Sequence, residues 1–600
     1  MAKIASAKSL QIDKLHTPQE PIRKFENMKK ELAITEAKNE EITNRNIVVF
    51  TGQSGIKVEK CLEKVKQSLP GFNVEILRIE KAMIETYKET HPDKKAFSER
   101  RIIVEILSLP PFAQRALWDK SFESIQKQLN NQDPKKLYFL SFHACFYHQK
   151  NREFLSPISL EKLVEIRKRV KMVIVLVDDC YDVYRRLLAT GEMFFQDVIS
   201  PNVTPEEAMV KSIFNLLTVL SWREIEIAFS RKISEIMGPP IPPMFVVAVK
   251  HPISLAQRLV SQSLEESRIF YVAHPITSIR KRTHARTAKF PENLNSFVEN
   301  LYNMHENDIL FLPDTVDELR IVKENEYYLP ELSSGWSLPF DEDSWLFNPL
   351  PNEVKGYNPL NPKDFKIPED KKEAVSYMVA LLARKIDEQI TSRDYALVEQ
   401  SKDGIIIFQP YWEGDISGGA LKEANYNSLL RDEIQNDRKT IIVEMHENLG
   451  KYRITELFTE LVTVALEDVD DNIRKKLRTL EESLKKDMDV VRQFYEGNYP
   501  LPEIISKAEQ QLPDIYNFNQ NFIRIQDPSL HGATMLEADE RLKAGWAALY
   551  ERVIELDPFK AECINQADEY CIAPSHDFDK RVQEFMAAIH LKQEKTKTGD

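Results

Sequence analysis

Short apolar runs alternate with helical patterns over the first part of the chain. The runs read "NIVVFTG", "NVEILRIE", "KLYFLSFHACFYH", "MVIVLVDD" and "MFVVAVKHP", at 46–52, 73–80, 136–148, 172–179 and 244–252. Continuous runs of this length indicate strands buried on both faces, and the intervening helices indicate parallel connections. We therefore predict a doubly wound parallel-sheet domain over residues 46–262.

The same rhythm restarts after residue 262. Its apolar runs read "RIFYVAHPIT", "DILFLPDT", "GIIIFQP" and "KTIIVEM", at 268–277, 308–315, 404–410 and 439–445. Residues 371–399 carry apolar positions at helical spacing, whereas residues 313–370 are rich in proline, aromatic and acidic residues. We predict a second, Rossmann-like α/β domain over 263–453, interrupted by an irregular insertion at 313–370.

The two ends of the chain lack this alternation of strands and helices. Residues 1–45 are polar with one helical pattern, and residues 454–600 combine helical periodicity with mixed charge. We expect an N-terminal helical extension and a helical C-terminal region. The predicted fold class is therefore α/β, with two doubly wound parallel-sheet domains and a helical C-terminal region.

Composition narrows the classes of partner. The 600 residues carry 42% hydrophobic and 29% charged residues and a formal net charge of −13. This charge argues against broad contact with nucleic acid, and no apolar run approaches the roughly 20 residues of a membrane helix. Five cysteines without a CxxC pair favour free thiols over zinc or disulfides. We expect a cytoplasmic protein that binds neither nucleic acid nor a membrane.

A first glycine loop, "FTGQSGIKVEKCL", joins the first predicted strand to a helix. Phosphate-binding P-loops occupy this place between a strand and a helix. The candidate nucleotide-binding residues are therefore Gly52, Ser54, Gly55 and Lys57. The P-loop pattern G-x-x-x-x-G-K-[ST] has its lysine one position later, where this chain has Val58, and its magnesium-binding hydroxyl where this chain has Glu59.

Residues 46–255 resemble the adenylate-kinase-like branch of the nucleoside monophosphate kinases. The segment "LSFHACFYHQKNREFLSP" has Ser141 where that family has an aspartate two residues before its histidine, here His143. The segment "VIVLVDDCYDVYRRL" places Arg185 and Arg186 as lid arginines. The resemblance implies ATP and Mg²⁺ as cofactors if the domain is active. We favour a degenerate domain that has lost phosphoryl transfer, because a fold does not carry the activity without its site.

A second set of motifs reads "YVAHPITSIR", "SRDYALVEQSKDGIIIFQP" and "SGGALKEANY". They resemble the superfamily of nucleoside 2-deoxyribosyltransferases and 2′-deoxynucleoside 5′-monophosphate N-hydrolases, over residues 267–447. The resemblance implies that Glu423 is the catalytic carboxylate, that Asp394 positions the substrate, and that Tyr271 orients Glu423. Where the family has glycine after the tyrosine and after the glutamate, this chain has His274 and Asn425.

Two polar residues bear on the substrate class. Six residues before the glutamate, the transferases have aspartate and the hydrolases have serine, and this chain has Ser417. A hydroxyl at the start of a helix suits a 5′-phosphate, whereas Asp415 nearby leaves a nucleoside open. The candidate substrate contacts are His274, Ser278, Arg280, Asp415, Ser417, Gly418 and Gly419.

The function that these motifs imply is cleavage or transfer of the N-glycosidic bond of a (deoxy)nucleoside 5′-monophosphate. No metal or cofactor is required, and the resemblance implies a homo-oligomer. Three alternatives stay open: an NAD-cleaving effector, a non-catalytic nucleotide-binding or scaffold protein, and a bifunctional kinase and glycosidase. Taken alone, Glu423 also fits an ordinary acid in the first turn of a helix, Asp394 a solvated helix residue, and Tyr271 a buried strand residue.

Overall fold

The computed structural model describes only part of the chain. The described residues are 45–130, 136–148, 153–191, 195, 202–238, 241–274, 297–303, 307–316, 321–324, 327–330, 342–346, 350, 369–410, 418–434, 437–445, 567–573, 580 and 582–589. They form two compact units. The first contains Phe72–Val175, Ile225–Phe245 and the described residues up to Thr51, and the second contains Gly52–Gly71, Leu176–Glu224 and the described residues from Val246 onward.

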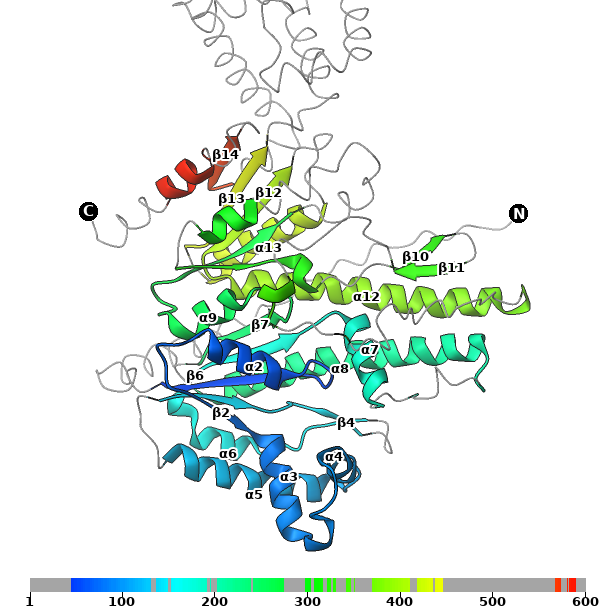
Figure 1. The fold of residues 1–600 in the computed structure, drawn as a ribbon. Helices are drawn as coiled ribbons and strands as arrows, with labels where there is room; N and C mark the ends of the chain where they lie inside the picture. Colours follow the sequence, from blue (N-terminus) through cyan, green and yellow to red (C-terminus); the bar gives the residue numbers. More distant parts are fainter. Residues whose placement is uncertain are drawn as a thin grey trace, which may run out of the picture. The chain divides into compact units, whose positions relative to one another are not determined.

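The first sheet has five strands in the order β2-β3-β1-β6-β7. Figure 1 labels its two edge strands, β2 and β7. Both β1 and β2 run parallel to β3, with Ile47 opposite Tyr138 and Val74 opposite Leu137. The strands are β1 (Ile47–Gly52), β2 (Val74–Arg78), β3 (Leu137–Ser141), β6 (Val170–Val177) and β7 (Met244–Ala248). All five apolar runs predicted in this part of the sequence are therefore strands.

Helices flank this sheet and a small antiparallel hairpin follows β3. The helices are α2 (Val58–Gln67), α3 (Ile79–Thr90), α4 (Glu99–Leu107), α5 (Pro111–Asn130), α6 (Leu160–Glu165), α7 (Cys180–Thr190), α8 (Pro205–Ile236) and α9 (Ile253–Ser261). The hairpin is β4 (Phe146–His148) with β5 (Glu153–Leu155). In the first unit, Trp118 and Phe122 of α5 stack at 5.0 Å within a core that also includes Val49 and Leu140.

The second sheet also has five strands, in the order β14-β13-β12-β8-β9. Every neighbouring pair is parallel. The strands are β8 (Arg268–Ala273), β9 (Asp308–Phe311), β12 (Gly404–Pro410), β13 (Lys439–Met445) and β14 (Glu569–Ala573), and the main helices are α12 (Lys372–Gln400) and α13 (Gly418–Ile434). Counted along the chain, this order is 2-1-3-4-5, which places the topological switch point between β8 and β12, where ligands bind in open α/β sheets.

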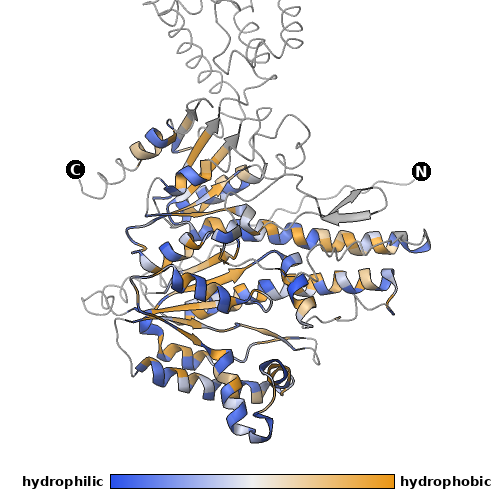
Figure 2. Cartoon of the chain, viewed as in Figure 1, coloured by the Kyte–Doolittle hydropathy of each residue, from blue (hydrophilic) through white to orange (hydrophobic). Residues whose placement is uncertain are grey.

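Both sheets confirm the predicted α/β class with parallel strands flanked by helices. Their strands are the most hydrophobic segments, and the helices mix apolar with polar positions (Figure 2). At the start of β12, Gly404 has φ +115°, and a Cβ there would lie 1.9 Å from the carbonyl oxygen of Lys439. Only glycine allows β12 to approach β13 this closely.

The edge strand β14 is one element that the expectation of a helical C-terminal region at 454–600 did not include. It pairs with β13, with Cys571 opposite Val443. The helical residues 582–589 follow it, and their buried side chains Val582, Met586 and Ile589 belong to the core of the second sheet. Residues 446–566 lie outside the described residues, as do residues 1–44 of the expected helical extension.

The described part of the predicted insertion includes a short hairpin. Strands β10 (Ile321–Glu324) and β11 (Tyr327–Pro330) pair antiparallel. Trp345 forms an isolated bridge with Pro252, and its carbonyl oxygen accepts a hydrogen bond of 2.8 Å from Lys64 Nζ. Within the described ranges, none of the helices combines the length and the apolar character that crossing a bilayer requires.

Candidate functional site

A buried hydrogen bond joins β8 to α13 beside the switch point of the second sheet. The Tyr271 hydroxyl donates to Glu423 Oε1 at 3.2 Å. Tyr271 is 0% exposed and Glu423 is 9% exposed. Because α13 begins at Gly418, Glu423 lies in the second turn of this helix. The sequence predicts the first turn instead. An ordinary dipole-stabilised acid of the first turn is therefore not the explanation for this residue.

A second carboxylate comes from α12. Arg393 donates to Asp394 Oδ1 twice, from Nε at 3.2 Å and from Nη2 at 2.9 Å. The two side chains are only 6% and 14% exposed. The sequence predicted Tyr271, Asp394 and Glu423 as one group, and the fold brings a strand and two helices together so that their charges interact. It did not assign a role to Arg393.

Burial and charge shift the ionisation of this group. Burial, and then the charge of Asp394, raise the pKa of Glu423 to about 8, although the Tyr271 hydroxyl and the Arg393 guanidinium oppose the shift. Burial, followed by the charges of Asp394 and Glu423, also holds the pKa of Tyr271 well above its ordinary value. A carboxyl with a strongly raised pKa beside a second carboxyl is a frequent property of catalytic sites.

The helices that carry the site are fixed to each other and to the sheet. Tyr395 of α12 stacks on Tyr426 of α13, with ring centroids 4.5 Å apart. The fully buried amide of Asn427 donates to Thr440 Oγ1 at 3.1 Å and accepts from Arg438 Nε at 3.0 Å. These contacts tie α13 to β13 one helical turn after Glu423, which limits the movement of its carboxyl group.

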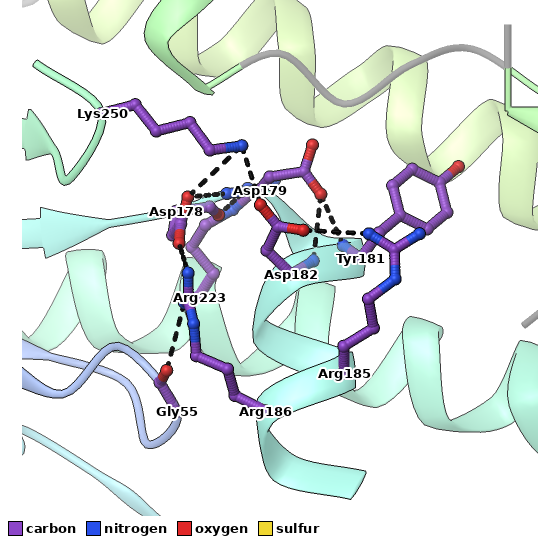
Figure 3. A network of polar contacts seen from close by, with 9 residues as sticks. All are labelled: Gly55, Asp178, Asp179, Tyr181, Asp182, Arg185, Arg186, Arg223 and Lys250. Atoms are coloured by element: carbon purple, nitrogen blue, oxygen red, sulfur yellow. Dashed lines mark hydrogen bonds and ion pairs between the residues drawn. The ribbon is translucent and has the colours of Figure 1, made fainter. Parts of the chain in front are cut away.

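The first glycine loop is packed against the protein itself. Gly55 has φ +90°, and a Cβ there would lie 3.0 Å from Leu187 Cγ and 3.2 Å from Val183 Cγ1, both in α7. Arg186 of the same helix donates from Nη1 to the Gly55 carbonyl oxygen at 3.2 Å (Figure 3). Lys57, which the P-loop motif predicts to contact phosphate, precedes α2 in a left-handed backbone conformation with φ +60°.

Arg186 belongs to a buried ionic network that follows β6. Its Nη2 lies 2.7 Å from Asp178 Oδ2, and both side chains are at most 2% exposed. Lys250 Nζ lies 2.9 Å from Asp182 Oδ2, and Arg185 Nη1 is 3.0 Å from Oδ1 of the same residue (Figure 3). Asp179 caps the start of α7 by accepting from two backbone amides. The two arginines expected in a lid are thus both engaged with carboxylates.

The loop after β3 directs three successive backbone amides at carboxyl groups of the protein, which the sequence did not reveal. The amide of His143 donates to Glu80 Oε1 at 2.7 Å. The next two amides, of Ala144 and Cys145, donate to the two carboxylate oxygens of Glu226 at 2.7 and 3.0 Å. Successive amides of this kind form a nest that binds anions, and here the protein fills the nest with its own carboxylates.

Comparison of the sequence with the models of known protein families gives no match, and comparison with curated proteins gives no significant match. The resemblances to deoxyribosyltransferases and to nucleotide kinases therefore rest on the motifs quoted above. The geometry of the described residues is what carries the functional argument.

The remaining candidates fall into two groups. His274 follows β8 and is buried, and Gly418 and Gly419 begin α13. Ser278, Arg280, Asp415 and Ser417 lie outside the described residues, so their roles stay predictions.

Neither replacement of a family glycine requires an unusual backbone. Among the described non-glycine residues, positive φ occurs at Lys57, and neither His274 nor Asn425 shares it. Within the same part of the chain, no group of three or more His, Cys, Asp or Glu side chains is arranged to hold a metal ion. Four of the cysteines lie there as buried thiols outside any disulfide: Cys61, Cys145, Cys180 and Cys571.

Proposed function

We propose that the second sheet carries an N-glycosidase or glycosyltransferase site for a (deoxy)nucleoside 5′-monophosphate, with Glu423 as its catalytic carboxylate. The observation that supports this most is the buried Tyr271–Glu423 hydrogen bond of 3.2 Å with Asp394 close enough to raise the pKa of Glu423. The hydrogen bond joins β8 to the helix after β12, the two strands between which the order of this 2-1-3-4-5 sheet reverses, and open α/β sheets commonly bind ligands at such a point.

The chemistry follows from two carboxyl groups in unlike surroundings. Cleavage of an N-glycosidic bond passes through a cation-like sugar, as in glycoside hydrolysis. The Glu423 carboxylate attacks the anomeric carbon or stabilises its positive charge, and Tyr271 holds one of its oxygens in place. Asp394 delivers a proton to the departing base, so that the electron pair of the broken bond leaves on a neutral base. Water as acceptor completes hydrolysis, and a second base completes transfer.

The preference for a nucleotide over a nucleoside comes from the sequence. Ser417 stands where the monophosphate hydrolases have serine, and it immediately precedes α13. The amides at the start of a helix attract a phosphate. A 5′-monophosphate is therefore the substrate class that we propose first, with the free nucleoside and NAD as the competing substrates.

A substrate panel tests this function. Base release from deoxynucleoside and nucleoside monophosphates, free nucleosides and NAD is followed by chromatography with the full-length protein. We expect release from monophosphates and its loss by a factor of roughly 10³ or more in Glu423→Gln, because the nucleophile is removed. Glu433→Gln, an exposed acid on the same helix, is the matched control and keeps full activity. Release from NAD alone identifies the effector alternative, and no release from any compound favours a binding or scaffold protein.

We further propose that the first glycine loop does not transfer phosphoryl groups. The Gly55 carbonyl accepts from buried Arg186, and the nest after β3 is filled by Glu80 and Glu226. A P-loop instead directs its amides at phosphates and has a serine or threonine whose hydroxyl binds magnesium. This chain has Glu59 at that position. We expect no ATP-dependent phosphorylation of nucleoside monophosphates. Phosphorylation that disappears in Lys57→Ala would contradict this and support the bifunctional alternative.

A further inference from the structure

Arg393 occupies an unusual position for a surface-helix arginine. It is 7% exposed, and both of its hydrogen bonds to Asp394 reach the same oxygen. Adjacent residues of a helix do not face each other, so the guanidinium has to fold back along α12 to make this contact. A buried cation is costly unless it is paired, and here the pair lies within the proposed active site.

The described residues whose charges act on Glu423 come from two elements. Asp394 and Arg393 act on it from α12, and Tyr271 acts on it from β8. With Glu423, these described residues supply two carboxyl groups, one guanidinium and one neutral phenol. One proton held by the two carboxyl groups makes these four side chains together electrically neutral, which is favoured in a buried site. Since Arg393 contacts Asp394 directly, Asp394 is the ionised member and Glu423 holds the proton before the substrate reacts.

We propose that Arg393 is a positioning residue of this site, which fixes the Asp394 carboxylate beside Glu423 and determines which of the two carboxyl groups carries their shared proton. This inference rests on the proposed glycosidase function. As positive charge develops on the sugar, the proton passes from Glu423 to Asp394, and the Glu423 carboxylate bonds to the anomeric carbon. The carbon–nitrogen bond breaks with its electron pair on the base, which takes the proton from Asp394. Water then hydrolyses the glycosyl ester.

A positioning role and a purely structural role of Arg393 predict different effects when this residue is substituted. An arginine that only stabilises α12 would alter the melting temperature and leave the ionisation of the carboxyl pair unchanged. An arginine that balances the pair lowers the upper apparent pKa of the two groups, because an opposite charge at close range favours the ionised form.

The test is the pH titration of this pair in the full-length protein. Infrared difference spectra with ¹³C-labelled aspartate or glutamate are recorded against pH, and Glu423→Gln identifies the signal. In Arg393→Gln we expect the upper apparent pKa to rise by roughly 1–3 units, with the alkaline limb of kcat/KM moving equally. Arg393→Lys keeps the charge but not the two-donor contact, so the upper apparent pKa should rise less in this variant. Arg384→Gln, on the same helix with a 79% exposed side chain, should titrate as the wild type.

The outcomes distinguish this inference from the function on which it rests. An unshifted upper pKa in Arg393→Gln overturns the inference, whatever its melting temperature. If that variant does not fold, an unshifted pKa in Arg393→Lys overturns it. A shifted pKa in a protein that releases no base supports the charge balance and contradicts the glycosidase. Base release by a protein whose pKa is unshifted supports the glycosidase and contradicts the charge balance.

Discussion

At the scale of single residues, the ionisation of Glu423 is governed first by burial and then by the charge of Asp394. A carboxyl group acts as a nucleophile only when it is ionised, and its pKa of about 8 means that it is mainly protonated at neutral pH. The shared proton is then already in the site and is available to the leaving base. We therefore expect the loss of this proton at high pH to lower both the activity and the stability of the protein.

The rate of base release should follow the proton that Glu423 and Asp394 share. Because kcat/KM reports the free enzyme, we expect it to stay high just below about pH 8 and to fall about tenfold per pH unit above it, where the proton is lost. The measurement is the pH profile of kcat/KM for a 5′-monophosphate between about pH 5 and about pH 9. A profile that is flat through this range would show that no group with this pKa limits the reaction.

Stability should also fall as the pH rises. The folded-state pKa of Glu423 is raised from 4.5 to about 8, so its contribution is complete below 4.5 and is lost as pH rises through 8. This group alone lowers the unfolding free energy by about 1.4 kcal/mol per pH unit in that window. Glu423→Gln cannot ionise and should therefore gain stability relative to the wild type as pH rises. Denaturant midpoints of both proteins at several pH values measure this difference in stability. Parallel curves of midpoint against pH for the two proteins would contradict the burial of the Glu423 carboxyl group.

At the scale of elements, α7 shows why the first glycine loop is not an open phosphate cradle. Its residues Val183 and Leu187 pack on Gly55, and Arg186 ties the loop carbonyl to Asp178 at the end of β6. The sequence predicted the strand, the loop and the helices of this region correctly. It could not predict the packing, because the pairing of Arg186 with a carboxylate before its own helix depends on how the chain turns.

Removing the buried partner of Asp178 should be strongly destabilising. Arg186→Met leaves a carboxylate with 0% side-chain exposure without its closest cation, and we expect a loss of roughly 3–5 kcal/mol. Arg115→Ala breaks the exposed pair with Glu161, whose side chains are 52% and 77% exposed, and should cost less than about 1 kcal/mol. Thermal unfolding of the two variants gives the comparison. Equal small losses would mean that the Arg186 pair is solvated.

At the scale of the whole molecule, the second sheet is completed by residues far along the chain. The strands β8, β12 and β13 and helix α12 were predictable from apolar runs and helical spacing, and the motifs predicted Tyr271, Asp394 and Glu423. Strand β14 was not predictable, because a five-residue edge strand carries little signal and its pairing with β13 spans a long stretch of sequence. The role that we propose for Arg393 was not predictable, because it depends on burial and not on spacing.

Truncation tests the contribution of this C-terminal strand. A chain ending at residue 566 lacks β14 and the apolar side chains Val582, Met586 and Ile589, which are each 1% exposed. Loss of this cover exposes the edge of β13 and part of the apolar core. We expect a lower melting temperature and faster proteolysis than in the full chain. Unchanged values would show that the segment adds no stability to the second sheet.

The central claim is that Glu423 is the catalytic carboxylate of an N-glycosidase site. The most direct measurement is chromatographic detection of free base from a deoxynucleoside 5′-monophosphate incubated with the wild type, Glu423→Gln and Glu433→Gln. The account predicts release by the wild type and by Glu433→Gln, and none above background with Glu423→Gln. Equal release by all three proteins, or release by none of them, would contradict it.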